Sequence, residues 1–143
     1  MQFRIKTEVK ANFNFVASHF GEPLFIYLWP NFTPIKIIQF DGTKPGNLVC
    51  VDTKLFGLIM KWSSQIIVTK KYETEVNFID QGIKLPFFLT YWEHKHRIIR
   101  HGSGTVVIDE IYYKSPNMIT ELLFYPILFF SFFMGVTFLK TIS

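Results

Sequence analysis

Alternation of apolar and polar residues is the clearest pattern in the first two thirds of the chain. Phe3, Ile5, Thr7 and Val9 alternate with polar neighbours, which is typical of a strand with one buried and one exposed face. Further strand patterns follow at residues 35–40, 47–54, 58–70, 71–80, 87–100 and 105–114. They are separated by turn residues, and Gln81-Gly82 is the turn expected after the strand at 71–80. The sequence therefore predicts one strand at the start and, after residue 32, a meander of about six more.

Two short helices are predicted between the first strand and this meander. Asn12 or Asn14 can cap a helix that continues through Val16 to Phe20 and ends at a glycine. Glu22-Pro23 then opens a second helix through Tyr27, because proline is tolerated in a first helical turn.

The C-terminal part of the chain is predicted to form one long helix. Residues 122–139 carry no charge, and six of these eighteen residues are phenylalanine. Ser115-Pro116-Asn117 supplies a capping residue and a proline at the helix start. A segment of this length can span a membrane, but the meander forms an antiparallel sheet whose apolar face needs a cover. We therefore expect the helix to cover the sheet, with an outermost stripe that includes Leu128, Phe132 and Leu139.

Composition and charge narrow the class of protein. The 143 residues, 49% hydrophobic and 18% charged, suit a single globular domain over residues 1–143. The net charge of +4 is scattered, with no basic run longer than Lys70-Lys71, so nucleic-acid binding is not expected. Cys50 is the one cysteine, which excludes an internal disulfide and favours a cytoplasmic location.

The last predicted hairpin carries the polar residues of interest. If its loop is Gly102-Ser103, cross-strand pairing places His96 opposite Asp109. By parity, one face then holds the following residues: Trp92, His94, His96, Ile98, Val107, Asp109, Ile111 and Tyr113. The charged residues Glu93, Lys95, Arg97 and Glu110 fall on the opposite face.

Two histidines and an aspartate that point toward an apolar interior allow four interpretations. They can form a buried network in which His96 and Asp109 satisfy each other. His94 and His96 can bind a metal, although this hairpin specifies no third ligand. The same groups can act as general acid and base, with His94, His96 and Asp109 as candidate catalytic residues. They can also hydrogen-bond the polar head of a lipophilic ligand. We assign no metal or cofactor on this basis.

A set of short motifs adds a resemblance to a known superfamily. Phe78-Ile-Asp80-Gln81-Gly82, Pro86-Phe87, Trp92-x-His94-x-His96, Gly104-Thr105, Asp109, Tyr113 and Pro116 occur in this order. The pattern resembles the START-like, Bet v 1-like superfamily (the SRPBCC group). Within that group it is most similar to small bacterial proteins described as polyketide cyclase/dehydrase-like or cell-division-inhibitor-like.

The resemblance implies an α+β helix-grip fold, in which a curved antiparallel sheet of seven or so strands wraps around a long C-terminal helix. It also implies a cavity between sheet and helix, since family members typically bind lipids, steroids or polyketides there. The predicted function is thus non-enzymatic binding of a hydrophobic small molecule or lipid. The predicted ligand-binding residues are Trp62, Phe78, Trp92, His94, His96, Asp109, Tyr113, Phe130 and Phe133.

Two other function classes stay open. One is a polyketide cyclase or dehydratase-like enzyme that uses His94, His96 and Asp109. The other is an interaction module in which the outer face of the C-terminal helix contacts a membrane surface or forms a homodimer.

Overall fold

The computed structural model describes residues 1–19, 35–55 and 57–141, with backbone alone from residue 134 onward. Within this part the elements are, in chain order, β1 (Gln2–Val9), α1 (Phe13–Ser18), β2 (Ile35–Phe40), β3 (Leu48–Leu55), β4 (Leu58–Lys71), β5 (Glu75–Lys84), β6 (Tyr91–His101), β7 (Gly104–Lys114) and α3 (Met118–Thr141).

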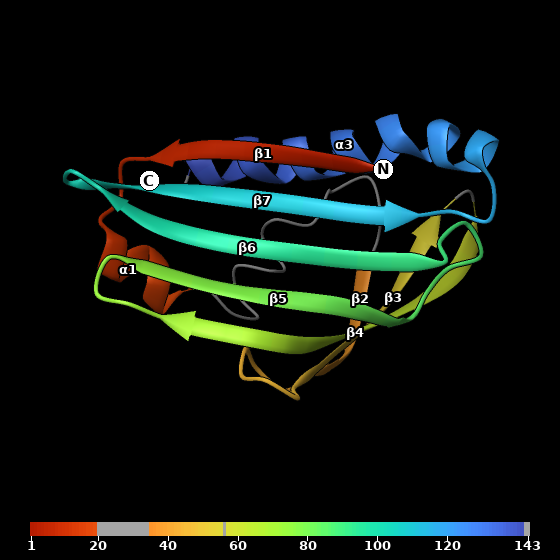
Figure 1. The fold of residues 1–143 in the computed structure, drawn as a ribbon, viewed down its shortest axis with the longest axis horizontal. Helices are drawn as coiled ribbons and strands as arrows, with labels where there is room; N and C mark the ends of the chain where they lie inside the picture. The colour runs from red at the N-terminus through yellow and green to blue at the C-terminus, as the bar shows by residue number, and fades with distance from the viewer. Residues whose placement is uncertain (20–34, 56, 142–143) are drawn as a thin grey trace.

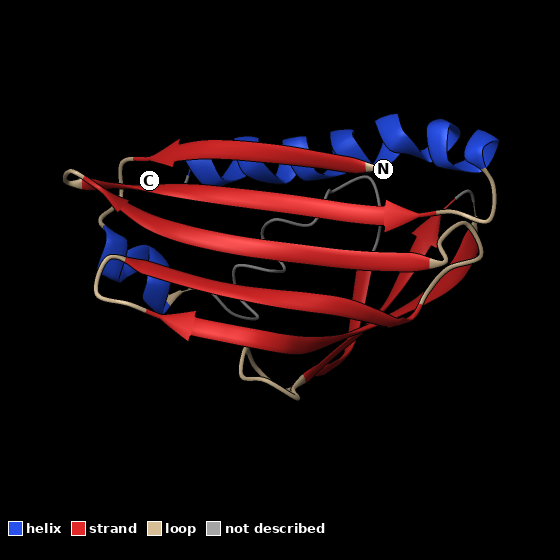
Figure 2. Ribbon diagram, in the orientation of Figure 1, coloured by secondary structure: helices blue, strands red, loops and turns tan. Residues whose placement is uncertain are grey.

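The described strands form one antiparallel sheet in the order β1-β7-β6-β5-β4-β3-β2. The sheet curves strongly, and α3 runs along β1, the edge strand next to β7 (Figures 1 and 2). The short helix α1 lies at one end of the sheet, beneath β6 and β7. This arrangement confirms the predicted α+β helix-grip fold with a curved sheet and a long C-terminal helix.

In β1 the apolar and polar residues of the sequence pattern alternate between buried and exposed positions. Phe3, Ile5, Thr7 and Val9 are buried, and the four polar residues that alternate with them, starting at Gln2, are exposed. β1 pairs with β7, so that Ile5 lies opposite Asp109. The first strand is therefore placed beside the last strand, and its apolar side chains enter the same interior.

The first helix, α1, is capped by Asn12, which is one of the two caps predicted from the sequence. Asn12 precedes α1 and its Oδ1 accepts a hydrogen bond of 2.8 Å from the backbone N–H of Phe15. Asn14, the other predicted cap, lies inside the helix and is exposed. The second predicted helix, over residues 22–27, lies outside the described residues.

One predicted turn is wrong. Gln81-Gly82 was expected to end its strand, but β5 continues to Lys84. The residue at this position of the strand is a glycine, and it has little space for a side chain. A Cβ on Gly82 would overlap the side chain of Leu85 and come within 3.1 Å of Trp92 Cβ. The glycine thus allows close packing inside the sheet.

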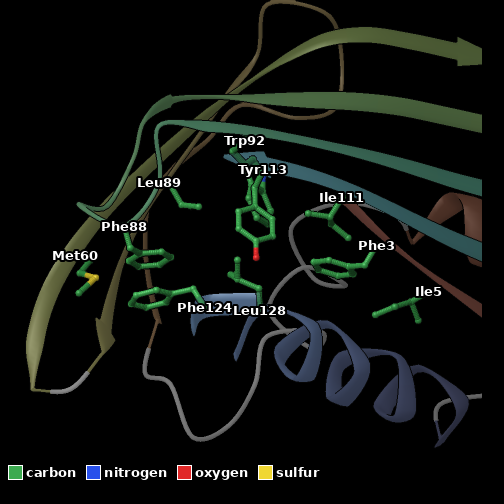
Figure 3. Close-up of a cluster of buried hydrophobic side chains, with 10 residues drawn as sticks. All are labelled: Phe3, Ile5, Met60, Phe88, Leu89, Trp92, Ile111, Tyr113, Phe124 and Leu128. Atoms are coloured by element: carbon green, nitrogen blue, oxygen red, sulfur yellow. The ribbon is translucent and has the colours of Figure 1, made fainter. Parts of the chain in front are cut away.

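The main core lies between the sheet and the first half of α3 (Figure 3). Phe124 of α3 stacks on Phe88, with ring centroids 4.0 Å apart and planes 3° from parallel. Tyr113 is fully buried, and its hydroxyl donates a 2.7 Å hydrogen bond to the carbonyl oxygen of Glu121 on α3. Stacked rings and this hydrogen bond together fix the helix to β7 and to the β5–β6 connection.

The cap and the faces of α3 differ from the sequence-based expectation. Asn117 caps the helix by accepting from the Thr120 backbone N–H at 2.9 Å, whereas Ser115 was the predicted cap. The prediction that Leu128 and Phe132 lie outermost is wrong, because Leu128 is buried and Phe132 contacts the interior rings. Leu139 lies beyond the side chains that the structure describes.

The large apolar side chains of α3 that are exposed lie elsewhere on the helix: Met118, Ile119, Leu122, Leu123, Phe129, Phe130 and Phe133. Among the residues that the structure describes, no helix has the combined length and hydropathy of a membrane span.

Candidate functional site

A cluster of two histidines and two aspartates lies at the centre of the sheet, on its inner face. His94 and His96 come from β6, Asp109 from β7 and Asp80 from β5. The strand register places Asp80 opposite His94 and His96 opposite Asp109. The predicted pairing of His96 with Asp109 is therefore confirmed, and the Gly102-Ser103 loop sets it as expected. We call Asp80, His94, His96 and Asp109 the His–Asp cluster.

Every member of the His–Asp cluster contacts another member directly. Asp109 Oδ1 lies 2.9 Å from His94 Nε2 and 3.1 Å from His96 Nδ1. Asp80 Oδ2 lies 3.1 Å from His96 Nε2 and 3.8 Å from His94 Nδ1. The two imidazole rings themselves have centroids 3.5 Å apart. The side chains are at most 14% exposed, so these interactions occur largely away from water.

The cluster drives the pKa values of its two histidines apart. Burial lowers the pKa of His94, and the positive charge of the neighbouring His96 lowers it further. Burial acts in the same direction on His96, but hydrogen bonds and charges from Asp109 and Asp80 outweigh it and raise the pKa to about 9. At neutral pH the structure thus favours a charged His96 beside a neutral His94.

Both carboxylates of the cluster are held ionised. Burial alone would raise the pKa of Asp109, but hydrogen bonds and charges from His94 and His96 hold it well below its usual range. The pKa of Asp80 is also lowered, against the effect of burial, by His96 and His94 and by a hydrogen bond from Ser64. Two buried negative charges therefore face the same pair of imidazoles.

Asp80 is the residue of this cluster that the hairpin reasoning missed. The signal was present, since Asp80 shares the parity of Phe78, which was expected to face the interior. The hairpin of β6 and β7 could not reveal it, because Asp80 lies on the neighbouring strand β5. With β5 continuous to Lys84, the parity rule applies and Asp80 points inward.

Aromatic rings extend from the cluster along the inner face. Trp62 of β4 meets Trp92 edge to face at 4.8 Å, and Trp92 stacks on Phe132 of α3 at 5.8 Å. Phe132 in turn meets His94 at 5.0 Å, and Phe78 stacks on His96 at 4.3 Å. We call Trp62, Trp92, Phe132 and Phe78 the aromatic row. It brings three of the predicted ligand-binding aromatics to the two histidines.

The other predicted site residues occupy different surroundings. Tyr113 is fully buried, and its hydroxyl is hydrogen-bonded to α3. Phe130 and Phe133 are 52% and 48% exposed, and Phe133 stacks on Phe129. Phe132, which was expected to face outward, is the helix residue that reaches His94. An almost entirely apolar helix gives no periodic signal that separates these neighbours.

The arrangement offers two kinds of chemistry. The His–Asp cluster can hydrogen-bond a polar group or relay a proton, since each imidazole contacts a carboxylate. Asp80, His94 and His96 also offer donor atoms that lie within 4.8 Å of one another, a spacing at which three ligands can surround one metal ion. Both kinds of chemistry use only side chains that already lie close together in the structure.

The chain therefore has the helix-grip fold, and several solved structures share this fold with it. Similar solved structures include protein Ms6760 from Mycobacterium smegmatis, with a TM-score of 0.72, 14% identity and coverage of 99% of this chain and 89% of that one. The Zhui aromatase/cyclase from Streptomyces sp. R1128 has a TM-score of 0.72 and 9% identity, over 99% of this chain and 92% of its own. Ginseng major latex-like protein 151 from Panax ginseng has a TM-score of 0.67 and 16% identity, over 96% of this chain and 92% of its own.

Identities this low establish the shared fold and leave the activity to be argued from the site. No protein-family model matches the chain, and no curated protein matches it in sequence.

Proposed function

We propose that this protein binds a hydrophobic small molecule or lipid between the inner face of the sheet and α3. The observation that carries the proposal is the aromatic row that ends at the His–Asp cluster. Binding sites for apolar molecules combine aromatic walls with a few convergent polar groups, which fix the orientation of the ligand.

Each part of the site has a role in this proposal. Trp62 and Phe132 are half-buried, so their rings can contact an apolar ligand without a large rearrangement. The polar end of the ligand would hydrogen-bond the His–Asp cluster and replace contacts that water would otherwise make. The helix-grip fold of the neighbouring structures supports this placement, because it sets a long helix against a curved sheet.

Native mass spectrometry of the full chain, purified from its own host, tests the proposal. We expect a bound apolar species that dissociates on denaturation and is recovered in organic extracts. Trp62→Ala should reduce its occupancy several-fold, because the indole forms the outer end of the aromatic row. Tyr72→Ala is the matched control, since Tyr72 is an exposed aromatic residue beyond the end of β4.

Two outcomes would contradict binding at this site. One is a protein that carries no apolar species and takes up no fluorescent fatty-acid or polyaromatic probe. The other is equal occupancy in Trp62→Ala and Tyr72→Ala, which would place the ligand elsewhere on the molecule.

A second candidate is a cyclase or dehydratase-like enzyme that acts on a polyketide-like substrate. It is favoured by the 2.9 Å contact between His94 and Asp109, which is the geometry of a general base with its orienting carboxylate. One structural neighbour is an aromatase/cyclase. In this case His94→Ala and His96→Ala should each abolish a pH-dependent turnover while the fold is retained. Normal ligand binding by both histidine variants, without turnover in the wild type, would exclude the enzyme.

A further inference from the structure

The two imidazoles of the His–Asp cluster are held between two carboxylates, one on each side. Asp109 Oδ1 contacts His94 Nε2 at 2.9 Å and His96 Nδ1 at 3.1 Å. Asp80 Oδ2 faces the other nitrogen of each ring, at 3.8 Å from His94 Nδ1 and 3.1 Å from His96 Nε2. Each ring therefore presents one nitrogen to Asp109 and its second nitrogen to Asp80.

The atoms on the Asp80 side have the spacing of metal ligands. One donor atom from each of Asp80, His94 and His96 lies within 4.8 Å of the others. Ligands bound to a tetrahedral zinc ion at 2.0–2.1 Å are about 3.3 Å apart from each other. The contacts of 3.1 Å and 3.8 Å lie on either side of this value. The two histidine nitrogens lie within 4.8 Å of each other, so side-chain rotation has to bring them closer to surround one ion.

We propose that Asp80, His94 and His96 bind a divalent transition-metal ion, with Zn²⁺ as the best match, and that Asp109 positions both imidazoles. Histidines that bind a metal almost always donate their second ring N–H to a carboxylate, a backbone carbonyl or water, which fixes the ring and its tautomer. Asp109 serves both rings at once through a single oxygen. Asp80 is the ligand that comes from a different strand and completes the set.

A divalent ion also balances the formal charge of this buried group. Two carboxylates, with side chains 9% and 14% exposed, bring two negative charges into the interior. A buried charge is costly unless it is paired or coordinates a metal. Neutral imidazoles are the form that binds metals. One divalent ion with two neutral histidines and two carboxylates therefore leaves no net charge on the cluster.

Three protein ligands leave one position of a tetrahedral ion for another group. Sites of this type hold water or part of a bound molecule at the fourth position. Phe132 and Phe78 border the two histidines, so aromatic rings lie beside the proposed site. The inference goes beyond apolar-ligand binding, because the metal site can be tested with no ligand present.

Calorimetric titration of metal-free, full-length protein with Zn²⁺ is the first test. We expect one ion per chain, with affinity reduced about 100-fold or more in Asp80→Asn and in His94→Gln, since each removes a ligand. Asp109→Asn should keep the stoichiometry and weaken binding about 10- to 100-fold, the effect of losing a positioning carboxylate. His101→Gln is the matched control, because His101 is exposed at the end of β6.

Co²⁺ absorption of the wild-type protein is a second measurement that needs no variant to fold. We expect visible bands of a four-coordinate ion with nitrogen and oxygen ligands, and displacement of Co²⁺ by Zn²⁺. A thiolate charge-transfer band would place the ion at Cys50 instead and overturn the inference. So would a wild type that does not bind Zn²⁺ saturably, or equal affinities in Asp80→Asn and His101→Gln. A chain that carries an apolar ligand but binds no Zn²⁺ refutes the metal site alone.

Discussion

Replacing Tyr113 by phenylalanine removes a hydroxyl through which β7 hydrogen-bonds α3 in the core. The ring of Tyr113 is fully buried, and its hydroxyl lies 2.7 Å from the carbonyl oxygen of Glu121 in the first turn of the helix. The substitution leaves the ring in place, so it tests the hydrogen bond without opening a ring-sized cavity.

The expected loss of stability is about 1 kcal/mol, the net value of a typical intramolecular hydrogen bond. It is not larger, because a carbonyl within a helix also accepts the helical bond and the Glu121 oxygen keeps a partner. For a chain of this length the loss corresponds to a decrease in melting temperature of about 3 °C. Removing the whole ring, in Tyr113→Ala, should cost about 3–5 kcal/mol.

Urea unfolding with an unchanged denaturant slope measures this difference. Tyr112→Phe is the matched control, since Tyr112 is the neighbouring tyrosine on the exposed face of β7. It should change the free energy of unfolding by less than about 0.5 kcal/mol. Equal stabilities of the two variants would refute the conclusion that the Tyr113 hydroxyl holds the helix to the sheet.

The wild type and Tyr113→Phe can also be compared as a function of pH. Burial, with a smaller effect of the Glu121 charge, raises the pKa of Tyr113 from 10.0 to about 12. A raised pKa means that the neutral tyrosine contributes stability in full below pH 10, and that this contribution is lost as the pH rises toward 12. The stability advantage of the wild type over Tyr113→Phe should therefore shrink across this interval. A stability difference between the two proteins that stays constant from pH 10 to 12 would contradict the raised pKa of Tyr113.

Three further substitutions test other contacts of the fold. Asn12→Ala removes the cap of α1 and should destabilise the protein by about 1 kcal/mol in urea unfolding. Gly104→Ala should cost about 1–3 kcal/mol, because the new Cβ would lie 2.6 Å from the Val9 carbonyl oxygen and push β1 from β7. Phe124→Ala removes the ring stacked on Phe88 and should cost about 3–5 kcal/mol, with an increase in hydrogen exchange along α3.

Each of these has an outcome that would contradict it. Asn14→Ala should be nearly neutral, so equal losses at Asn12 and Asn14 would show that the cap is misassigned. A Gly104→Ala protein as stable as the wild type would mean that the two strands separate without cost. Leu123 is 62% exposed, and Leu123→Ala should cost less than about 1 kcal/mol. A loss as large as that of Phe124→Ala would contradict the assigned inner face of α3.

The sheet and three of the four residues of the His–Asp cluster could be predicted from the sequence because the relevant signals are local. A two-residue loop at Gly102-Ser103 fixes the register of the last hairpin, and parity then sends His94, His96 and Asp109 to one face. The N-terminal strand was equally clear, since its buried and exposed residues alternate without exception.

The remainder depends on contacts between segments that are distant in the sequence. Gly82 has the residue type of a turn, and its packing role appears only once Leu85 and Trp92 lie against it. Asp80 was missed for the same reason. On α3, Leu128 and Phe132 could not be assigned to the inner face, because a helix that is apolar on every side has no amphipathic period. Tertiary contacts select the buried face in such a helix.

The position of β1 has a consequence for the order in which the chain folds. Gln2 pairs with Tyr112, so the first strand finds its partner 110 residues further along the sequence. During synthesis on the ribosome, Phe3 and Ile5 must remain unpaired until β7 has emerged, because no other described strand lies beside β1. A strand pair this distant in sequence forms late, because the entropy cost of closing the intervening chain has to be overcome first. The N-terminal strand is therefore the segment that a holdase chaperone has the longest time to bind.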